Sequence, residues 1–205
     1  RHLQTMSLCL FAKLILPDPS KNDKIKDNRR DLRRMAAKFE VYIASKKYSS
    51  IKMCEAIFPI VGKIQFSEKC IVWNDWLPTK EDVFYTQDDK QIELFVLNSK
   101  IVYFNGKAGS HIIGARQYFE NGVFCTELWF DTSYFPELDT NIPNEFCNSF
   151  CQSTKQNILE LCIVAEIKFF AMGTEMCVDY SEQLDESIKK SHNVMCYWSK
   201  KASRD

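Results

Sequence analysis

Cysteine, asparagine and tyrosine side chains that could do chemistry gather in two stretches of this sequence. The stretch NEFCNSFCQSTKQN (residues 144–157) holds the close pair Cys147 and Cys151, and GTEMCVDY (residues 173–180) ends in Tyr180. Cysteine thiolates bind zinc, but a structural site takes four ligands, and the three histidines lie far from this pair in the sequence. The spacing therefore disfavours a zinc centre.

Motifs of the common catalytic classes are missing from the sequence. A P-loop, a GxGxxG turn, a GxSxG elbow and an HExxH helix are all absent, and none of the six glycines has the spacing of a phosphate cradle. The adjacent carboxylates Asp88 and Asp89 fall in a turn-like context, where solvation explains them. The residues alone thus predict a β-rich domain with a basic helix.

Length and composition predict a folded chain with a real core. The 205 residues fit one domain with an appended element, and 45% of them are apolar. The nine cysteines are odd in number, spread along the chain and often set in apolar runs such as LCLF and LCIV. A disulfide framework is typical of smaller, loop-rich chains, so we expect a reducing, intracellular environment. No apolar run reaches the length of a membrane span.

The net charge of zero hides a basic N-terminal quarter. Residues 1–52 carry 13 Lys and Arg against 5 Asp and Glu, whereas the rest of the chain carries 14 against 22. Apolar residues at helical spacing predict an amphipathic helix over residues 24–44: Leu32, Met35, Ala36, Phe39 and Ile43. Its other face is basic: Arg29, Arg30, Arg33, Arg34 and Lys38. This face could be solvated, pack on the acidic remainder, or bind nucleic acid or an acidic partner; it lacks interleaved aromatic residues for base stacking.

From residue 49 onward, the pattern is typical of a mostly antiparallel β protein. Apolar and β-branched clusters separated by turn residues predict strands within residues 56–66, 69–73, 92–97 and 100–106. Two longer strands are expected over residues 123–131 and 158–167. Residues 80–91 are expected to form a loop or short helix, and residues 181–191 a short polar helix.

Four segments in order resemble the SET domain of protein lysine methyltransferases. They are SKIVYFNGKAG (residues 99–109), ELWFDTSYF (127–135), the cysteine-pair stretch, and LCIVAEIKFFAMGTEMCVDY (161–180). The resemblance implies a SET-like β-fold with several small sheets and a pseudoknot-like crossing. It also implies three parts: a basic helical segment (1–48), a SET-like domain (49–181) and a C-terminal helix and tail (182–205).

The same resemblance implies a damaged methyl-transfer site. Asn148, Ser149 and Cys151 match the family's segment beside S-adenosylmethionine, but Ser149 stands where the family has His. Tyr180 matches the catalytic tyrosine. The family's Gly-x-Gly approach to the cofactor has no clear counterpart, so Phe150 is expected to fill the pocket.

Three hypotheses follow. We favour a catalytically degenerate SET-like module without a cofactor, acting as a nuclear, chromatin-associated scaffold. Its partner protein would bind the basic helix (Arg29, Arg30, Arg33, Arg34) or exposed aromatic residues around Trp73 and Trp76. The alternative is a divergent lysine methyltransferase that uses S-adenosylmethionine, with Tyr180 as the catalytic residue. The third is an unrelated β-rich protein-binding domain.

Overall fold

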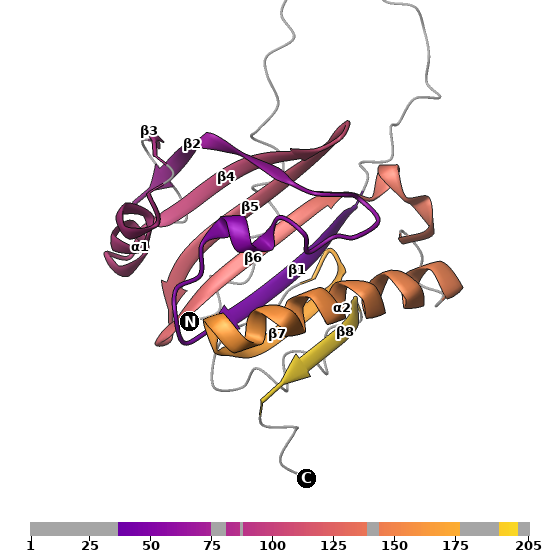
Figure 1. Cartoon of the computed structure of the whole chain (residues 1–205). Helices are drawn as coiled ribbons and strands as arrows, with labels where there is room; N and C mark the ends of the chain where they lie inside the picture. The colour runs from indigo at the N-terminus through magenta and orange to yellow at the C-terminus, as the bar shows by residue number, and fades with distance from the viewer. Residues whose placement is uncertain (1–36, 75–80, 87, 139–143, 177–192, 201–205) are drawn as a thin grey trace, which may run out of the picture. The chain divides into compact units, whose positions relative to one another are not determined.

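The computed structural model describes residues 37–74, 81–86, 88–138, 144–176 and 193–200 (Figure 1). Every described residue belongs to one compact unit, which lies within residues 35–205. Its elements in chain order are β1 (Lys38–Ser45), the 3-10 helix η2 (Ile51–Cys54), β2 (Gln65–Trp73), β3 (Glu81–Tyr85), α1 (Asp89–Leu97), β4 (Ile101–Ala108), β5 (His111–Glu120), β6 (Val123–Asp131), η3 (Thr132–Tyr134), η4 (Pro136–Leu138), α2 (Glu145–Ala165), β7 (Ile167–Thr174) and β8 (Val194–Ser199).

The strands form one antiparallel sheet of eight strands in the order β3-β2-β4-β5-β6-β1-β7-β8. β4, β5 and β6 are consecutive hairpin partners, whereas β1 inserts between β6 and β7 in the interior of the sheet. The mostly β prediction is therefore confirmed. The strands make one large sheet, where the resemblance implied several small ones.

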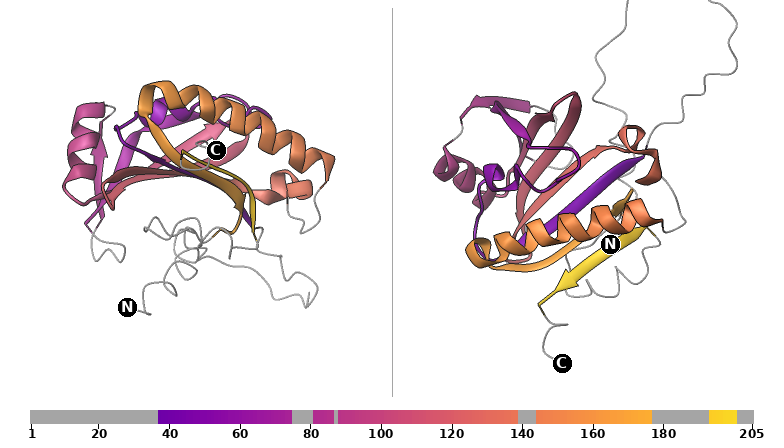
Figure 2. Two further views of the ribbon diagram at one scale, coloured as in Figure 1. Left: turned by 90° about the horizontal axis from the view of Figure 1, so that it is seen from below. Right: turned by 45° about the vertical axis from the view of Figure 1, so that its right-hand side comes forward.

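The described helices lie on one face of the sheet (Figure 2, left). Because successive side chains of a strand point to opposite faces, alternate residues of every strand meet these helices. The centre of this core is a cluster of aromatic rings whose centroids lie 5.0–6.3 Å apart, from β1, the loop after η2, β6 and α2: Phe39, Phe58, Phe130 and Phe150. All four side chains are fully buried.

The opposite face carries a second cluster of buried side chains. Its members come from six strands and the residues that follow β7: Tyr42, Ala44, Trp73, Ile101, Tyr118, Cys125, Phe169, Ala171 and Met176. This cluster is more polar than the helix-side core, since it includes two tyrosines and one tryptophan. The polar groups described below belong to this face.

Helix α2 forms because its N-terminus is capped and one of its faces is apolar. Asn144 is the N-cap, and its Oδ1 accepts a hydrogen bond of 2.8 Å from the backbone N–H of Cys147. Buried residues recur at helical spacing along the face that meets the sheet: Cys147, Phe150, Cys151, Thr154 and Ile158. The helix ends at Glu166, which adopts the left-handed conformation with φ 52°.

Three expectations from the sequence are wrong. Residues 38–44 belong to strand β1, because Phe39, Val41 and Ile43 also fit the two-residue period of a strand. Residues 92–97 belong to α1, which Asp88 caps by accepting a hydrogen bond from the N–H of Lys90. Residues 158–165 belong to α2 rather than to a strand.

Of the remaining expectations, some are confirmed and others are wrong in part. Residues 69–73 and 101–106 lie in β2 and β4, and β6 has the expected bounds of Val123–Asp131. The strand expected within residues 56–66 is wrong for most of its length, because residues 56–64 form turns and irregular backbone and β2 begins only at Gln65. The loop or short helix expected over residues 80–91 is wrong for Glu81–Tyr85, which form β3, and right for the start of α1 at Asp89. The polar helix expected over residues 181–191 and the part of the N-terminal helix over residues 24–36 lie outside the described residues.

Candidate functional site

The residues that the SET resemblance assigned to cofactor binding lie on one helix and point in different directions. Asn148 and Ser149 are exposed on α2, whereas Cys151 is buried against the sheet with 6% exposure. Tyr180, the catalytic candidate, lies outside the described residues, as do Arg29, Arg30, Arg33, Arg34 and Trp76. Among the described residues, the structure therefore gathers no constellation of these candidates.

Trp73 was expected to be an exposed aromatic residue, and this is wrong. Its side chain is 7% exposed, and its ring centroid lies 4.2 Å from that of Tyr103 on the neighbouring strand β4. Trp73 ends strand β2 on the face opposite the described helices, where it belongs to the second cluster. As the tryptophan is held inside this cluster, it is unsuited to first contact with a partner.

A row of directly opposed residues crosses the face opposite the described helices from edge to edge. Residues directly opposite each other in neighbouring strands share a face of the sheet. From β3 to β8 the row consists of Val83, Ile71, Tyr103, Arg116, Glu127, Tyr42, Ala171 and Tyr197. Its two ends are exposed, at 53% for Val83 and 45% for Tyr197, while Glu127 in the middle is 3% exposed. The row thus places charged groups in the buried centre of the face.

The centre of the row is an ion pair with a tyrosine hydrogen bond. The Arg116 guanidinium donates to Oε2 of Glu127 through Nε and pairs with the same oxygen through Nη2. The Tyr118 hydroxyl donates to Oε1 of Glu127. Both carboxylate oxygens of Glu127 are therefore engaged. A buried charge pair is stable only with such complete hydrogen bonding.

Glu40 is the second acidic group on this face. Its Oε2 accepts a hydrogen bond of 2.8 Å from the N–H of Met176, and the Tyr42 hydroxyl lies 3.5 Å from the same oxygen. Burial, together with the negative charges of Glu127 and Glu175, raises the pKa of Glu40 to about 8. Glu40 is therefore mostly protonated at neutral pH and could serve as a general acid. In the described part of the chain, the neighbours that hydrogen-bond to Glu40 are the Met176 N–H and the Tyr42 hydroxyl, and both contacts serve the fold.

The polar groups of this face were missed in the sequence reading. Glu40 and Tyr42 alternate on β1, as do Arg116 and Tyr118 on β5. Alternation of this kind normally marks a solvated strand face. Only the cross-strand register, which the sequence does not display, shows that Arg116 lies opposite Glu127 and that these two charges neutralise each other.

The edge of the sheet at β2 is only partly covered. β3 pairs with β2 from Lys69 to Trp73 and ends at Tyr85, so on this side of β2 no described strand lies beside residues 65–68. On the other side of β2, Phe66 lies opposite Gly106 and Cys70 opposite Phe104, so residues 67–69 bulge against Asn105 alone. Backbone N–H and C=O groups at such an edge are free to pair with another chain.

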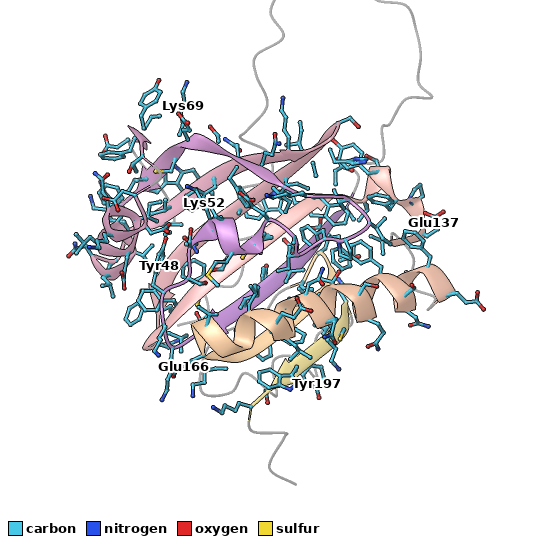
Figure 3. The ribbon with its side chains drawn as sticks, in the orientation of Figure 1. Tyr48, Lys52, Lys69, Glu137, Glu166 and Tyr197 are labelled. Atoms are coloured by element: carbon cyan, nitrogen blue, oxygen red, sulfur yellow. The ribbon has the colours of Figure 1, made fainter. Side chains whose placement is uncertain are left out.

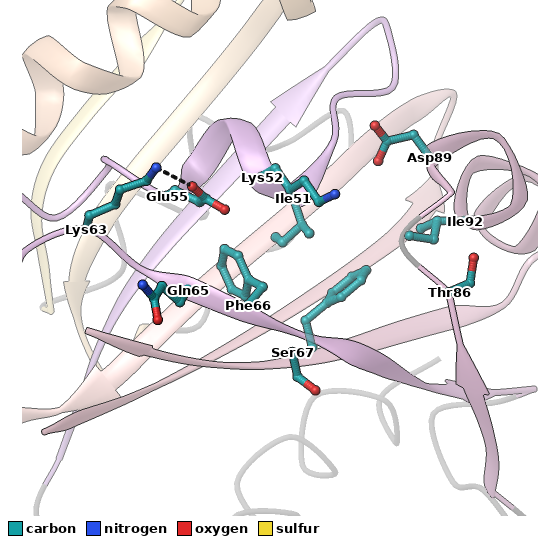
Figure 4. A pocket seen from close by; sticks show the side chains of 11 residues that line it. Ile51, Lys52, Glu55, Lys63, Gln65, Phe66, Ser67, Thr86, Asp89 and Ile92 are labelled. Atoms are coloured by element: carbon teal, nitrogen blue, oxygen red, sulfur yellow. Dashed lines mark ion pairs between the residues drawn. The ribbon is translucent and has the colours of Figure 1, made fainter. Parts of the chain in front are cut away.

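A groove with a volume of about 210 Å³ lies beside this open edge, between η2, β2 and the start of α1 (Figure 4). Lys52 extends from η2, and Lys69 marks the point on β2 where the pairing with β3 begins (Figure 3). The floor of the groove is formed by the apolar side chains of Ile51, Ile92 and Phe104, which are buried. Polar side chains form its rim. Neither the open edge nor the groove was expected from the sequence, since both depend on where β3 stops.

Comparison of the chain with protein-family models, with curated proteins and with solved structures gives no match. Within the described residues, no group of three or more His, Cys, Asp or Glu side chains has a geometry that could hold a metal ion. No helix in the same part of the chain is long and apolar enough to cross a membrane. The site itself must therefore carry any functional proposal.

Proposed function

We propose that this chain is a protein-interaction module that binds an extended segment of a partner protein at the open edge of β2. The observation that carries the proposal is the gap in pairing at residues 65–68, where β3 has ended and no other described strand takes its place. An extended peptide can add a strand to such an edge, with main-chain hydrogen bonds giving affinity and neighbouring pockets giving specificity.

Two features of the edge support selective binding. The groove lies against the unpaired residues, so a guest strand would place one of its side chains over the apolar floor. The bulge at residues 67–69 and the exposed charge of Glu68 limit the length of regular strand that could pair there. A short, specific segment therefore suits the site better than open-ended edge pairing between sheets.

The SET resemblance, which rests on sequence motifs alone, adds a proposed setting for this binding. In that setting the chain is a degenerate SET-like scaffold in a nuclear, chromatin-associated complex. The alternative remains a divergent methyltransferase with Tyr180 as catalytic residue. Calorimetric titration of the full chain with S-adenosylmethionine separates the two. Micromolar binding would support the enzyme, and no heat at millimolar cofactor would support the scaffold.

The strand-addition proposal can be tested with a phage-displayed library of random nine-residue peptides, selected on the full chain. Selected peptides are expected to protect the amides of residues 65–68 from hydrogen exchange, because strand addition gives these groups hydrogen-bond partners. The amides of β8, the strand at the other edge of the sheet, serve as the internal control. Protection at β8 alone, or no selected peptide at all, would overturn the proposal.

Proline substitutions supply an independent check. Successive N–H groups of a strand point to opposite sides, so one of the two N–H groups at Ser67 and Glu68 points outward from the edge. Proline has no N–H, so either Ser67→Pro or Glu68→Pro removes this outward donor. At least one of the two variants is expected to lose peptide binding tenfold or more while its thermal unfolding stays cooperative. Unchanged affinity in both folded variants would contradict strand addition.

A further inference from the structure

The groove beside β2 has a hydrophobic floor and one aromatic wall, the Phe66 side chain, which lies over Gly106. Ile51, Ile92 and Phe104 form the floor and are 4%, 1% and 3% exposed. Phe66 forms the wall, and its ring packs 6.4 Å from that of Phe104 in an edge-on arrangement. A side chain at Gly106 would meet the Phe66 ring at 2.9 Å, so the glycine makes room for this wall. Such a surface suits a flat apolar group.

The groove is large enough for a single side chain but too small for a whole cofactor. Its volume is about 210 Å³. Pockets for drug-sized ligands and cofactors generally measure about 300–1,000 Å³. One large aromatic side chain, attached to a backbone that stays outside, matches the smaller volume.

Four charged side chains lie on the rim of the groove, two lysines and two carboxylates. Nζ of Lys63 and Oε2 of Glu55 lie 3.2 Å apart at one end of the groove. Lys52 and Asp89 lie toward the other end, as Figure 4 shows, and neither has an ion-pair partner in the described part of the chain. An ammonium donor and a carboxylate acceptor are thus both available above the apolar floor.

We propose that the groove holds a tyrosine side chain from the partner segment. The aromatic ring would pack against the Phe66 side chain in the groove, and the hydroxyl would donate to Asp89 and accept from Lys52. A hydroxyl can do both, whereas the indole N–H of tryptophan only donates and phenylalanine has no polar group. This inference rests on the strand addition proposed above, which would hold the backbone of the guest beside residues 65–68.

The test uses the full chain and a tyrosine probe without any strand, N-acetyl-L-tyrosine amide. At millimolar concentration the probe is expected to shift the NMR signals of the Ile51 and Ile92 methyl groups. The matching phenylalanine amide is expected to bind about tenfold more weakly, because the hydrogen bonds to charged groups are lost. Equal binding of the two probes, or no shift at either methyl group, would overturn the tyrosine assignment.

Two variants identify the rim groups. Asp89→Asn is expected to remove most of the preference for tyrosine over phenylalanine, while Glu160→Gln, an exposed carboxylate on α2, should leave the preference unchanged. Full preference in Asp89→Asn would overturn the role of this carboxylate.

The same measurements keep the two proposals apart. Selected peptides that lack tyrosine and still protect residues 65–68 would overturn the tyrosine assignment and support strand addition. Binding of the tyrosine probe with no peptide at the edge would overturn strand addition and support the tyrosine pocket alone.

Discussion

The backbone N–H of Met176 donates a hydrogen bond of 2.8 Å to Oε2 of Glu40, and this contact joins the chain after β7 to the interior strand β1. The same carboxyl group lies close to Glu127 and Glu175, whose negative charges add to the effect of burial and raise its pKa to about 8. A proton on Glu40 therefore stabilises this part of the sheet. Stability should depend on pH through this one group.

Replacing Glu40 with glutamine should remove that dependence. The pKa of Glu40 is raised in the folded state, so the folded chain holds its proton between about pH 4.5 and 8 while the unfolded chain releases it. Stability is then lost as pH rises through this window, by at most about 1.4 kcal/mol per pH unit. Glu40→Gln should show a flatter profile in urea unfolding from pH 5 to 8, with Glu160→Gln as the exposed control. A wild-type stability that rises across the window would contradict the assignment.

Breaking the Arg116–Glu127 pair should cost more than removing it entirely. The two side chains are 15% and 5% exposed, so loss of one partner leaves a buried charge. Arg116→Met or Glu127→Leu alone should each destabilise the fold by about 3–5 kcal/mol. The double variant should be more stable than either single variant, as measured by chemical denaturation at constant pH. Additive losses in the double variant would show that the charges do not interact.

The sequence could predict those parts of the fold in which the pattern of apolar residues fits only one type of secondary structure. β6 is a run of apolar, aromatic and β-branched residues bounded by turns, and its bounds were predicted correctly. The run at 158–165 was misassigned, because a short apolar run of β-branched residues fits a buried strand as well as a helix. The distinguishing signal lay upstream in the spacing of Phe150, Thr154 and Ile158, together with the Asn144 cap.

The candidate site could not be predicted in the same way, because it depends on register and on strand ends. Arg116 and Glu127 are eleven residues apart, and only the β5–β6 hairpin register makes them neighbours. The groove exists because β3 stops at Tyr85 while β2 continues back to Gln65. No local pattern of residue types reports where a partner strand ends.

Phe150 should be one of the largest single contributors to stability. Its ring is fully buried and contacts Phe39 at a centroid distance of 5.0 Å, which anchors α2 to β1. Phe150→Ala should lower the free energy of unfolding by about 3–5 kcal/mol. Its neighbour Ser149 is exposed on the same helix, so Ser149→Ala should change stability by about 0.5 kcal/mol or less. A negligible loss in Phe150→Ala would place the ring outside the core.

Gly114 should be intolerant of any side chain, because the indole ring of Trp129 lies over it across the β5–β6 pair. A methyl group at this position would overlap the ring, so the ring or the strand must move. Gly114→Ala should destabilise the fold by about 1–3 kcal/mol, the usual cost of overpacking.

The matched control for this prediction is Gly109, where an added methyl group meets nothing within 4 Å and only its φ of 60° opposes substitution. Gly109→Ala should cost about 1 kcal/mol whether or not the tryptophan is present. The cost of Gly114→Ala, in contrast, should largely disappear in a Trp129→Ala background, since the clashing ring is then absent. A double-mutant cycle by thermal unfolding measures this coupling. If the two positions show none, steric contact with the indole cannot be the reason for a glycine at position 114.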